Sequence, residues 1–302
     1  MTKVFAILTI AFSSLSFPVF AQTNSLRQRI QDLITTKKAE VGVAVSAIED
    51  SDTLSINGDR HFPLQSVFKF HIALAVLSRV DQGKFSLDQK IEIPKSALLP
   101  NLYSPIRDEY PNGATLPLSK ILEYTVSKSD NVGCDALLRL IGGPPAVEEW
   151  LAKNNFTNVS IKINEEVQQA NWDLQFQNWT TPKAANGVLA AFYTNSKKLL
   201  SKKSHAFLLK IMERTETGAA RLKGLLPKNT VVAHKTGSSG ANKEGITAAV
   251  NDIGIVTLPN GKHYVISAFV SNSKENNDTN EKIIADISKL IWDYFIGKKN
   301  RP

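Results

Sequence analysis

Apolar residues recur with two different periods along the chain, and the period changes with position. Residues 25–38 carry apolar side chains three or four positions apart, which predicts a helix. Two runs rich in β-branched residues follow at 41–48 and 53–56, and the acidic segment between them predicts a hairpin turn. The chain is therefore expected to begin with a helix followed by two strands.

The middle of the chain is mostly helical in its periodicity. An apolar stripe begins at Ser66 and continues to the neighbourhood of Gly83, so a helix is expected to start at this serine. Similar patterns predict further helices at residues 118–125, 131–140, 146–154, 182–193 and 202–212.

Strand patterns return near the C-terminus, at residues 231–235, 247–257 and 263–270. The last two strands are joined by Pro259-Asn260-Gly261, which is typical of a hairpin turn. A final helix is predicted at residues 281–294.

Strands from both ends of the chain, with helices between them, favour an α+β fold. We expect an α/β sandwich in which a five-stranded antiparallel sheet is flanked by helices and carries an inserted all-helical subdomain. The sheet subdomain would comprise about residues 22–64 and 213–302, and the helical subdomain about residues 65–212.

The first 21 residues have the pattern of an export signal. They hold a single lysine, an apolar run and small residues near Ala21, at the positions that a signal peptidase reads. A membrane anchor is the alternative, but serines and Pro18 interrupt the run, which is short for the roughly 20 apolar residues that a transmembrane helix requires. We therefore expect residues 1–21 to be removed and residues 22–302 to form one soluble domain.

Charge and cysteine content narrow the classes of function. The formal net charge is +8, but the basic residues are scattered and no basic stripe alternates with aromatic residues, so nucleic acid is not an expected partner. Cys134 is the single cysteine, which rules out an intrachain disulfide, and its apolar neighbours predict a buried, unreactive thiol. The five histidines form no HxH or HExxH pair, so neither a metal nor another cofactor is expected.

Ser66 and Lys69 lie three positions apart, so on a helix they share one face within hydrogen-bonding reach. At the start of that helix the free backbone N–H groups favour an oxyanion, and a nearby amine can activate the serine. By itself the spacing is weak evidence, because it recurs at Ser271 and Lys274.

Two further motifs follow in the chain. Ser129-Asp130-Asn131 stands just before a predicted helix, where a simple N-cap is the alternative interpretation. Lys235-Thr236-Gly237 ends a predicted strand, where an ordinary glycine turn is the alternative. Together with Ser66-Val67-Phe68-Lys69, and in this order, they resemble the motif set of the penicillin-recognising serine enzymes.

Within that superfamily the sequence resembles the class A serine β-lactamases from about residue 26 to residue 294. It is most similar to the PER and VEB branch of extended-spectrum enzymes, through residues 175–179, the Ser-Pro after Tyr103, and His234 before the third motif. In this branch a wider cavity admits bulky oxyimino cephalosporins.

The resemblance also implies a glutamate that activates water for deacylation. In class A enzymes it lies four residues before an amide, and Glu165 stands four residues before Gln169. Glu166 is the alternative, but it stands four residues before an alanine. Because Ile163 and Asn178 replace a common Arg–Asp ion pair, the loop that carries the glutamate must be held differently.

The remaining roles are also implied by the resemblance, position by position. Backbone N–H groups of Ser66 and Ser238 would form an oxyanion hole, and Ser129 would relay a proton to the ring nitrogen. Lys69 would lie at the centre of the proton network. Substrate contacts would come from Tyr103, Asn131, Gln169, Arg221, Lys235 and Thr236.

The expected function is thus hydrolysis of penicillins and cephalosporins through a serine acyl-enzyme, which confers antibiotic resistance. We expect a monomer in the periplasm. A soluble DD-peptidase of the same fold is the alternative enzyme, and the loop glutamate disfavours it. A catalytically silent protein that binds peptidoglycan or a polyanion is the alternative from a different class, and the completeness of the motifs disfavours it.

Overall fold

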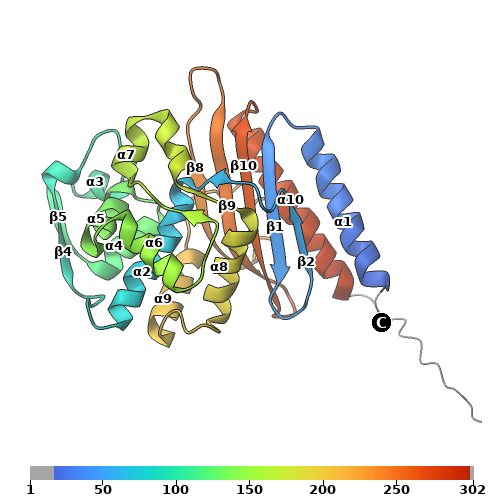
Figure 1. Ribbon diagram of the computed structural model, residues 1–302, viewed down its shortest axis with the longest axis horizontal. Coiled ribbons are helices and arrows are strands. Elements are labelled where there is room, and N and C mark those ends of the chain that lie inside the picture. Colours follow the sequence, from blue (N-terminus) through green and yellow to red (C-terminus); the bar gives the residue numbers. More distant parts are fainter. Residues whose placement is uncertain (1–16, 300–302) are drawn as a thin grey trace, which may run out of the picture.

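The computed structural model describes residues 17–299, and its centre is a five-stranded antiparallel sheet with helices on both faces (Figure 1). The strand order is β2-β1-β10-β9-β8. The strands are β1 (Glu40–Ala47), β2 (Thr53–Ile56), β8 (Val232–Ser238), β9 (Thr247–Thr257) and β10 (His263–Ser273). The predicted sheet, built from both ends of the chain, is confirmed.

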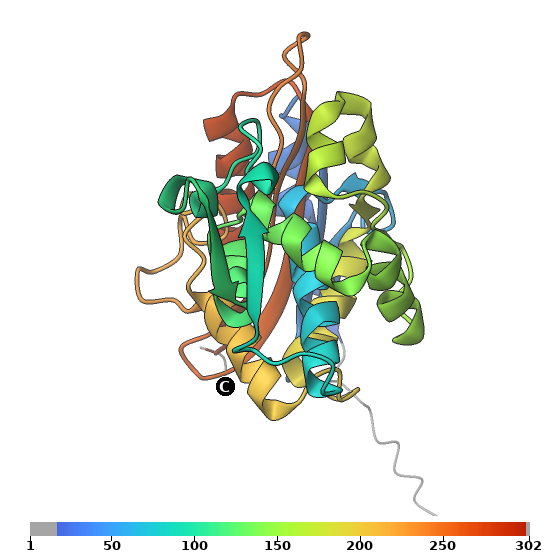
Figure 2. The ribbon, with the colours of Figure 1, turned by 90° about the vertical axis from the view of Figure 1, so that its left-hand side faces the viewer.

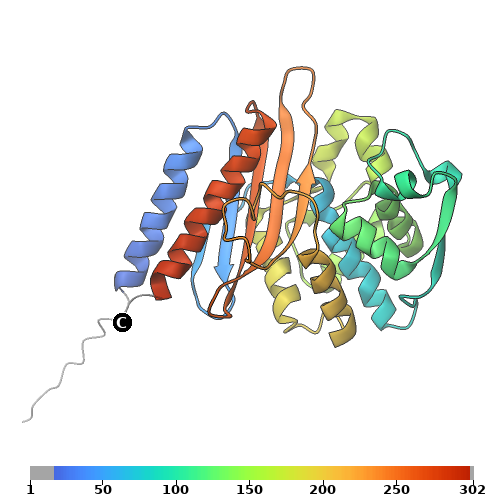
Figure 3. The same cartoon turned by 180° about the vertical axis from the view of Figure 1, so that it is seen from behind.

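Pairing of β1 with β10 closes the fold, because it joins the N-terminal hairpin to the C-terminal strands. Val41 is opposite Val270 and Val45 is opposite Ile266 in this antiparallel ladder. On the outer face of the sheet, α1 (Phe17–Thr35) and α10 (Asn277–Lys299) lie side by side, as Figure 3 shows from behind. Residues 1–16, most of the expected export signal, lie outside the described residues.

The other face of the sheet meets a helical region, which Figure 2 shows toward the viewer. Its longer helices agree with the predictions to within a few residues. They are α2 (Phe68–Asp81), α4 (Leu118–Ser127), α5 (Asn131–Ile141), α6 (Pro144–Lys153), α8 (Pro182–Thr194) and α9 (Lys202–Glu213).

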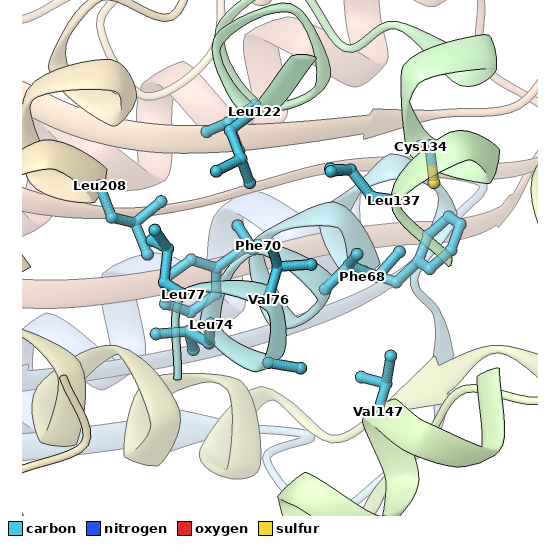
Figure 4. Close-up of a cluster of buried hydrophobic side chains, with 14 of the residues drawn as sticks. Phe68, Phe70, Leu74, Val76, Leu77, Leu122, Cys134, Leu137, Val147 and Leu208 are labelled. Atoms are coloured by element: carbon cyan, nitrogen blue, oxygen red, sulfur yellow. The ribbon is translucent and has the colours of Figure 1, made fainter. Parts of the chain in front are cut away.

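Helix α2 runs through the middle of the helical region and is enclosed on all sides. Every residue from Phe68 to Leu77 is buried, including Lys69 and His71. Figure 4 shows Phe68, Phe70, Leu74 and Val76 among apolar side chains of neighbouring helices. A helix that is buried on every side is a core helix, so α2 gives the rest of the site a fixed support.

Several short elements are absent from the sequence-based predictions because their patterns span only a few residues. A hairpin forms from β4 (Lys90–Pro94) and β5 (Gly113–Pro117). Around the site lie β3 (Phe62–Pro63), β6 (Val159–Ser160), β7 (Trp179–Thr180), α3 (Pro105–Glu109) and α7 (Glu165–Ala170). The described part of the chain also contains three 3₁₀ turns, η1 (Gln65–Val67), η2 (Lys95–Ala97) and η3 (Trp172–Gln177). No helix within residues 17–299 is long and apolar enough to cross a membrane.

Candidate active site

Ser66 lies in the 3₁₀ turn η1, two residues before α2 begins at Phe68. The predicted helix start is therefore two residues too early. Strand β8 passes so near this turn that a Cβ on Gly237 would lie 2.6 Å from the Leu64 carbonyl oxygen and 3.3 Å from the Ser66 nitrogen. Only a glycine lets the end of β8 lie against the segment that carries Ser66.

Lys69 is completely buried and connects three parts of the site. Its Nζ donates to Ser66 Oγ at 2.8 Å, to the Ser129 carbonyl at 2.7 Å and to Asn131 Oδ1 at 2.5 Å. Nζ is also 2.8 Å from Glu165 Oε1. The spacing that places Ser66 and Lys69 on one face is confirmed, and the amine contacts the hydroxyl directly.

Ser129 and Asn131 are brought to this centre by the residue between them. Asp130 caps α5 by accepting from the Gly133 N–H at 2.7 Å, and it also accepts from Ser104 Oγ and the Ile106 N–H. The N-cap interpretation of the second motif is therefore correct for Asp130, while the residues on either side face the cavity. Burial raises the pKa of Asp130, and the N–H donors partly offset that shift.

Lys235 is buried on β8, opposite Ile253 of β9. Its Nζ donates to Ser129 Oγ and to the Thr236 carbonyl, both at 2.9 Å. Burial and the nearby positive charge of Lys69 hold the pKa of Lys235 well below its usual range, against the attraction of Glu165 and Asp252.

Arg221 lies behind the end of β8 and is almost fully buried. Its guanidinium donates to Ser238 Oγ at 2.6 Å, to the Gly237 carbonyl at 3.0 Å and to the Asn251 carbonyl at 2.9 Å. Its Nε donates to Glu281 Oε1 of α10 at 3.0 Å. Glu281 was not selected in the sequence analysis, because no motif surrounds it.

Glu165, rather than Glu166, faces the nucleophile. Its side chain is 1 % exposed and its Oε1 accepts from Ser66 Oγ at 3.3 Å, whereas Glu166 is exposed at the surface. The geometry therefore distinguishes two adjacent glutamates that a short motif leaves open.

Two adjacent glutamines differ in their relation to Glu165, and the expected role of Gln169, to hold the deacylating water together with Glu165, stays a prediction. Gln168 Nε2 donates to Glu165 Oε2 at 3.2 Å, whereas Gln169 is exposed and lines the cavity.

The loop that carries Glu165 is held by side-chain hydrogen bonds in place of an ion pair. The Asp135 carboxylate accepts from the N–H groups of Glu165 and Glu166 at 2.9 and 3.0 Å and from Asn164 Nδ2. Asn178 bonds both the N–H and the carbonyl of Ile163. The prediction that this loop is held differently is confirmed, but Asp135 was missed because it lies in a helix with no recognisable motif.

These groups surround a cavity of about 230 Å³. Nine residues selected from the sequence line it, Ser66, Tyr103, Ser129, Asn131, Glu165, Gln169, Arg221, Thr236 and Ser238. Gly237 of the third motif also lines it, and sequence reasoning missed Gln65 and Thr217. Lys69 and Lys235 lie behind its wall. Cys134 is a buried free thiol whose pKa is raised well above its ordinary value by burial, as predicted.

The comparisons with known proteins agree with this arrangement. A model of the β-lactamase enzyme family matches residues 25–295. The chain belongs to the β-lactamase enzyme family. It is 55% identical to the β-lactamase VEB-1 of Pseudomonas aeruginosa over 278 residues, which cover 92% of this chain and 93% of that protein.

Further relatives place this β-lactamase in class A, in the VEB and PER branch. The extended-spectrum β-lactamase PER-1 of P. aeruginosa is 42% identical over 97% of this chain and 94% of its own length. The crystal structure of the extended-spectrum β-lactamase TLA-3 is 52% identical, with a TM-score of 0.89, and covers 91% of this chain and 99% of that one. A class A β-lactamase from Bacteroides cellulosilyticus is 41% identical, with a TM-score of 0.87, over 91% and 99% of the two chains. The chain is therefore a class A β-lactamase and a hydrolase.

Proposed function

We propose that this β-lactamase opens its substrate through an acyl-enzyme on Ser66. The observation that carries the proposal is the double contact of Ser66 Oγ, with Lys69 Nζ at 2.8 Å and Glu165 Oε1 at 3.3 Å. A serine hydroxyl is a weak nucleophile until a neighbouring group accepts its proton. Here two such groups lie within reach, Lys69 on α2 and Glu165 on α7.

In the acylation step, Ser66 Oγ forms a bond to the β-lactam carbonyl carbon and its proton passes to the Lys69–Glu165 pair. The ring C–N bond then breaks, and the nitrogen takes a proton through Ser129, whose hydroxyl contacts Lys235 Nζ at 2.9 Å. The carbonyl oxygen would lie between the N–H groups of Ser66 and Ser238, and the close approach of β8 to Ser66 supports that placement.

In the deacylation step, Glu165 takes a proton from water, which attacks the ester carbon. The bond from that carbon to Ser66 Oγ breaks, and Ser66 regains its proton. The burial of Glu165 beside the ester position supports this role, because a base is effective when it is held within hydrogen-bonding reach of the proton it removes.

Substrate recognition would use side chains on β8 and the Arg221 guanidinium behind it. Lys235, Thr236 and Arg221 would hold the substrate carboxylate, Asn131 its side-chain amide, and the exposed Tyr103 would border the entrance together with Gln169. Similarity to relatives named extended-spectrum supports oxyimino cephalosporins as substrates. We also propose export through residues 1–21, a periplasmic location and a monomeric state.

The test is mass spectrometry of the mature protein after rapid mixing with an oxyimino cephalosporin, with ring opening followed by ultraviolet absorbance. A transient adduct on Ser66 with rapid ring loss is expected, and Ser66→Ala should form no adduct. A stable adduct with little ring loss would instead indicate a penicillin-binding peptidase and would remove Glu165 from the mechanism.

A further inference from the structure

Three buried glutamine side chains form a continuous chain of hydrogen bonds that ends at Glu165. Gln65 Nε2 donates to Gln175 Oε1 at 2.5 Å, and Gln168 Nε2 donates to Gln65 Oε1 at 3.1 Å. The same Gln168 nitrogen donates to Glu165 Oε2 at 3.2 Å. Their exposed fractions are only 3% for Gln65 and 4% for each of the other two, so water competes little for these bonds.

The direction of every amide in this chain is fixed from one end. Gln175 Nε2 donates to the Trp172 carbonyl at 2.7 Å, and a carbonyl oxygen can only accept. Gln175 must therefore present its oxygen to Gln65, which in turn presents its own oxygen to Gln168. The N–H groups of Gln168 are then left to face Gln65 and Glu165. Asn178 Nδ2, 3.4 Å from Gln168 Oε1, agrees with that orientation.

The chain also connects two segments that are far apart in the sequence. Gln65 immediately precedes Ser66 in η1, whereas Gln175 lies in η3 and Gln168 in α7. The amides thus tie the turn that carries the nucleophile to the loop that carries the carboxylate. Buried networks in which every member is satisfied fix a unique arrangement of their side chains.

We propose that Gln175 and Gln65 are positioning residues for deacylation. They orient the Gln168 amide so that its N–H groups point at Glu165, and this contact holds the carboxylate where it reaches the attacking water. The inference rests on the proposed acyl-enzyme mechanism. It also assigns a role to Gln175, which the sequence analysis named only as part of the family resemblance.

The experiment compares Gln175→Met, Gln168→Met and the double variant, because methionine keeps the volume and removes the amide. Rapid-quench mass spectrometry with a cephalosporin would give separate rate constants for acylation and deacylation. Each single variant should slow deacylation about five- to tenfold, the loss expected for one hydrogen bond, and change acylation less than about twofold. Gln177→Met is the matched control, because Gln177 lies in the same 3₁₀ turn and is exposed; it should leave both rate constants unchanged.

The double variant separates positioning from ordinary packing. If Gln175 acts through Gln168, adding Gln175→Met to Gln168→Met has no further effect on deacylation, whereas additive losses would overturn the proposal. A wild-type enzyme that forms no adduct would instead refute the proposed function, while normal deacylation by Gln175→Met refutes only the amide chain.

Discussion

Strand β8 and the loop of residues 161–181 form opposite walls of the active site, and different kinds of bonds hold them. Strand β8 is held by backbone pairing to β9, which aligns Lys235 with Ile253 and Gly237 with Asn251. The loop contains only short elements, α7, η3 and β7, and the side chains of Asp135 and Asn178 fix its backbone. Backbone hydrogen bonds hold a strand in place with most side-chain types, whereas the position of this loop depends on a few particular side chains.

The largest effect should come from the loop wall. Glu165→Gln removes the base for water while it leaves Ser66 and Lys69 in place, so deacylation should fall by about 10²- to 10⁴-fold and acyl-enzyme should accumulate. Mass spectrometry of the reacting enzyme measures this directly. Glu166→Gln is the matched control and should turn over normally, since Glu166 is exposed. A Glu165→Gln enzyme with wild-type turnover would move the base elsewhere.

The second effect is the pH dependence of stability that comes from Asp135, whose carboxylate holds the loop backbone. Burial raises the pKa of Asp135 from 3.8 to about 6, so between these values the folded chain keeps a proton that the unfolded chain has released. The free energy of unfolding contributed by Asp135 therefore falls as the pH rises from about 4 to 6, by roughly 3 kcal/mol, and is constant above that range.

Asp135→Asn isolates this contribution. His71, whose pKa burial lowers to about 4, has the opposite sign: its contribution is lost as the pH falls from 6.5 toward 4. In the wild type the contributions of Asp135 and His71 to the pH dependence of stability oppose each other. The Asp135→Asn variant keeps the His71 contribution, so the difference between the two proteins reports Asp135 alone. Urea unfolding at several pH values should show the stability of the variant, relative to wild type, rising between pH 4 and 6. Parallel curves for the two proteins would contradict the assignment.

The same contrast explains what the sequence could predict. Long periodic segments such as β9 were predicted with their observed ends, and the three motifs placed Ser66, Ser129 and Lys235 together because Ser66 and Ser129 lie just before helices and Lys235 lies on a strand. The loop wall was harder, because the partner of Glu165 depends on where a six-residue helix begins. Spacing selected Gln169, which lines the cavity, but gave no sign that Gln168 donates to Glu165. Asp135 acts through its position beside a distant loop, which leaves no local signal.

The smallest effect in this series tests the strand wall. Gly237→Ala would place a methyl group 2.6 Å from the Leu64 carbonyl and 3.0 Å from Gln65 Cβ, so β8 must move away from the turn that carries Ser66. Overpacking of this kind costs about 1–3 kcal/mol, and we expect kcat/KM to fall about tenfold to a hundredfold through slower acylation. Gly240→Ala, where a Cβ meets no atom within 4 Å, should be neutral. Equal activity of the two variants would mean that the strand wall yields as readily as the loop, and that backbone pairing to β9 does not fix the distance between β8 and Ser66.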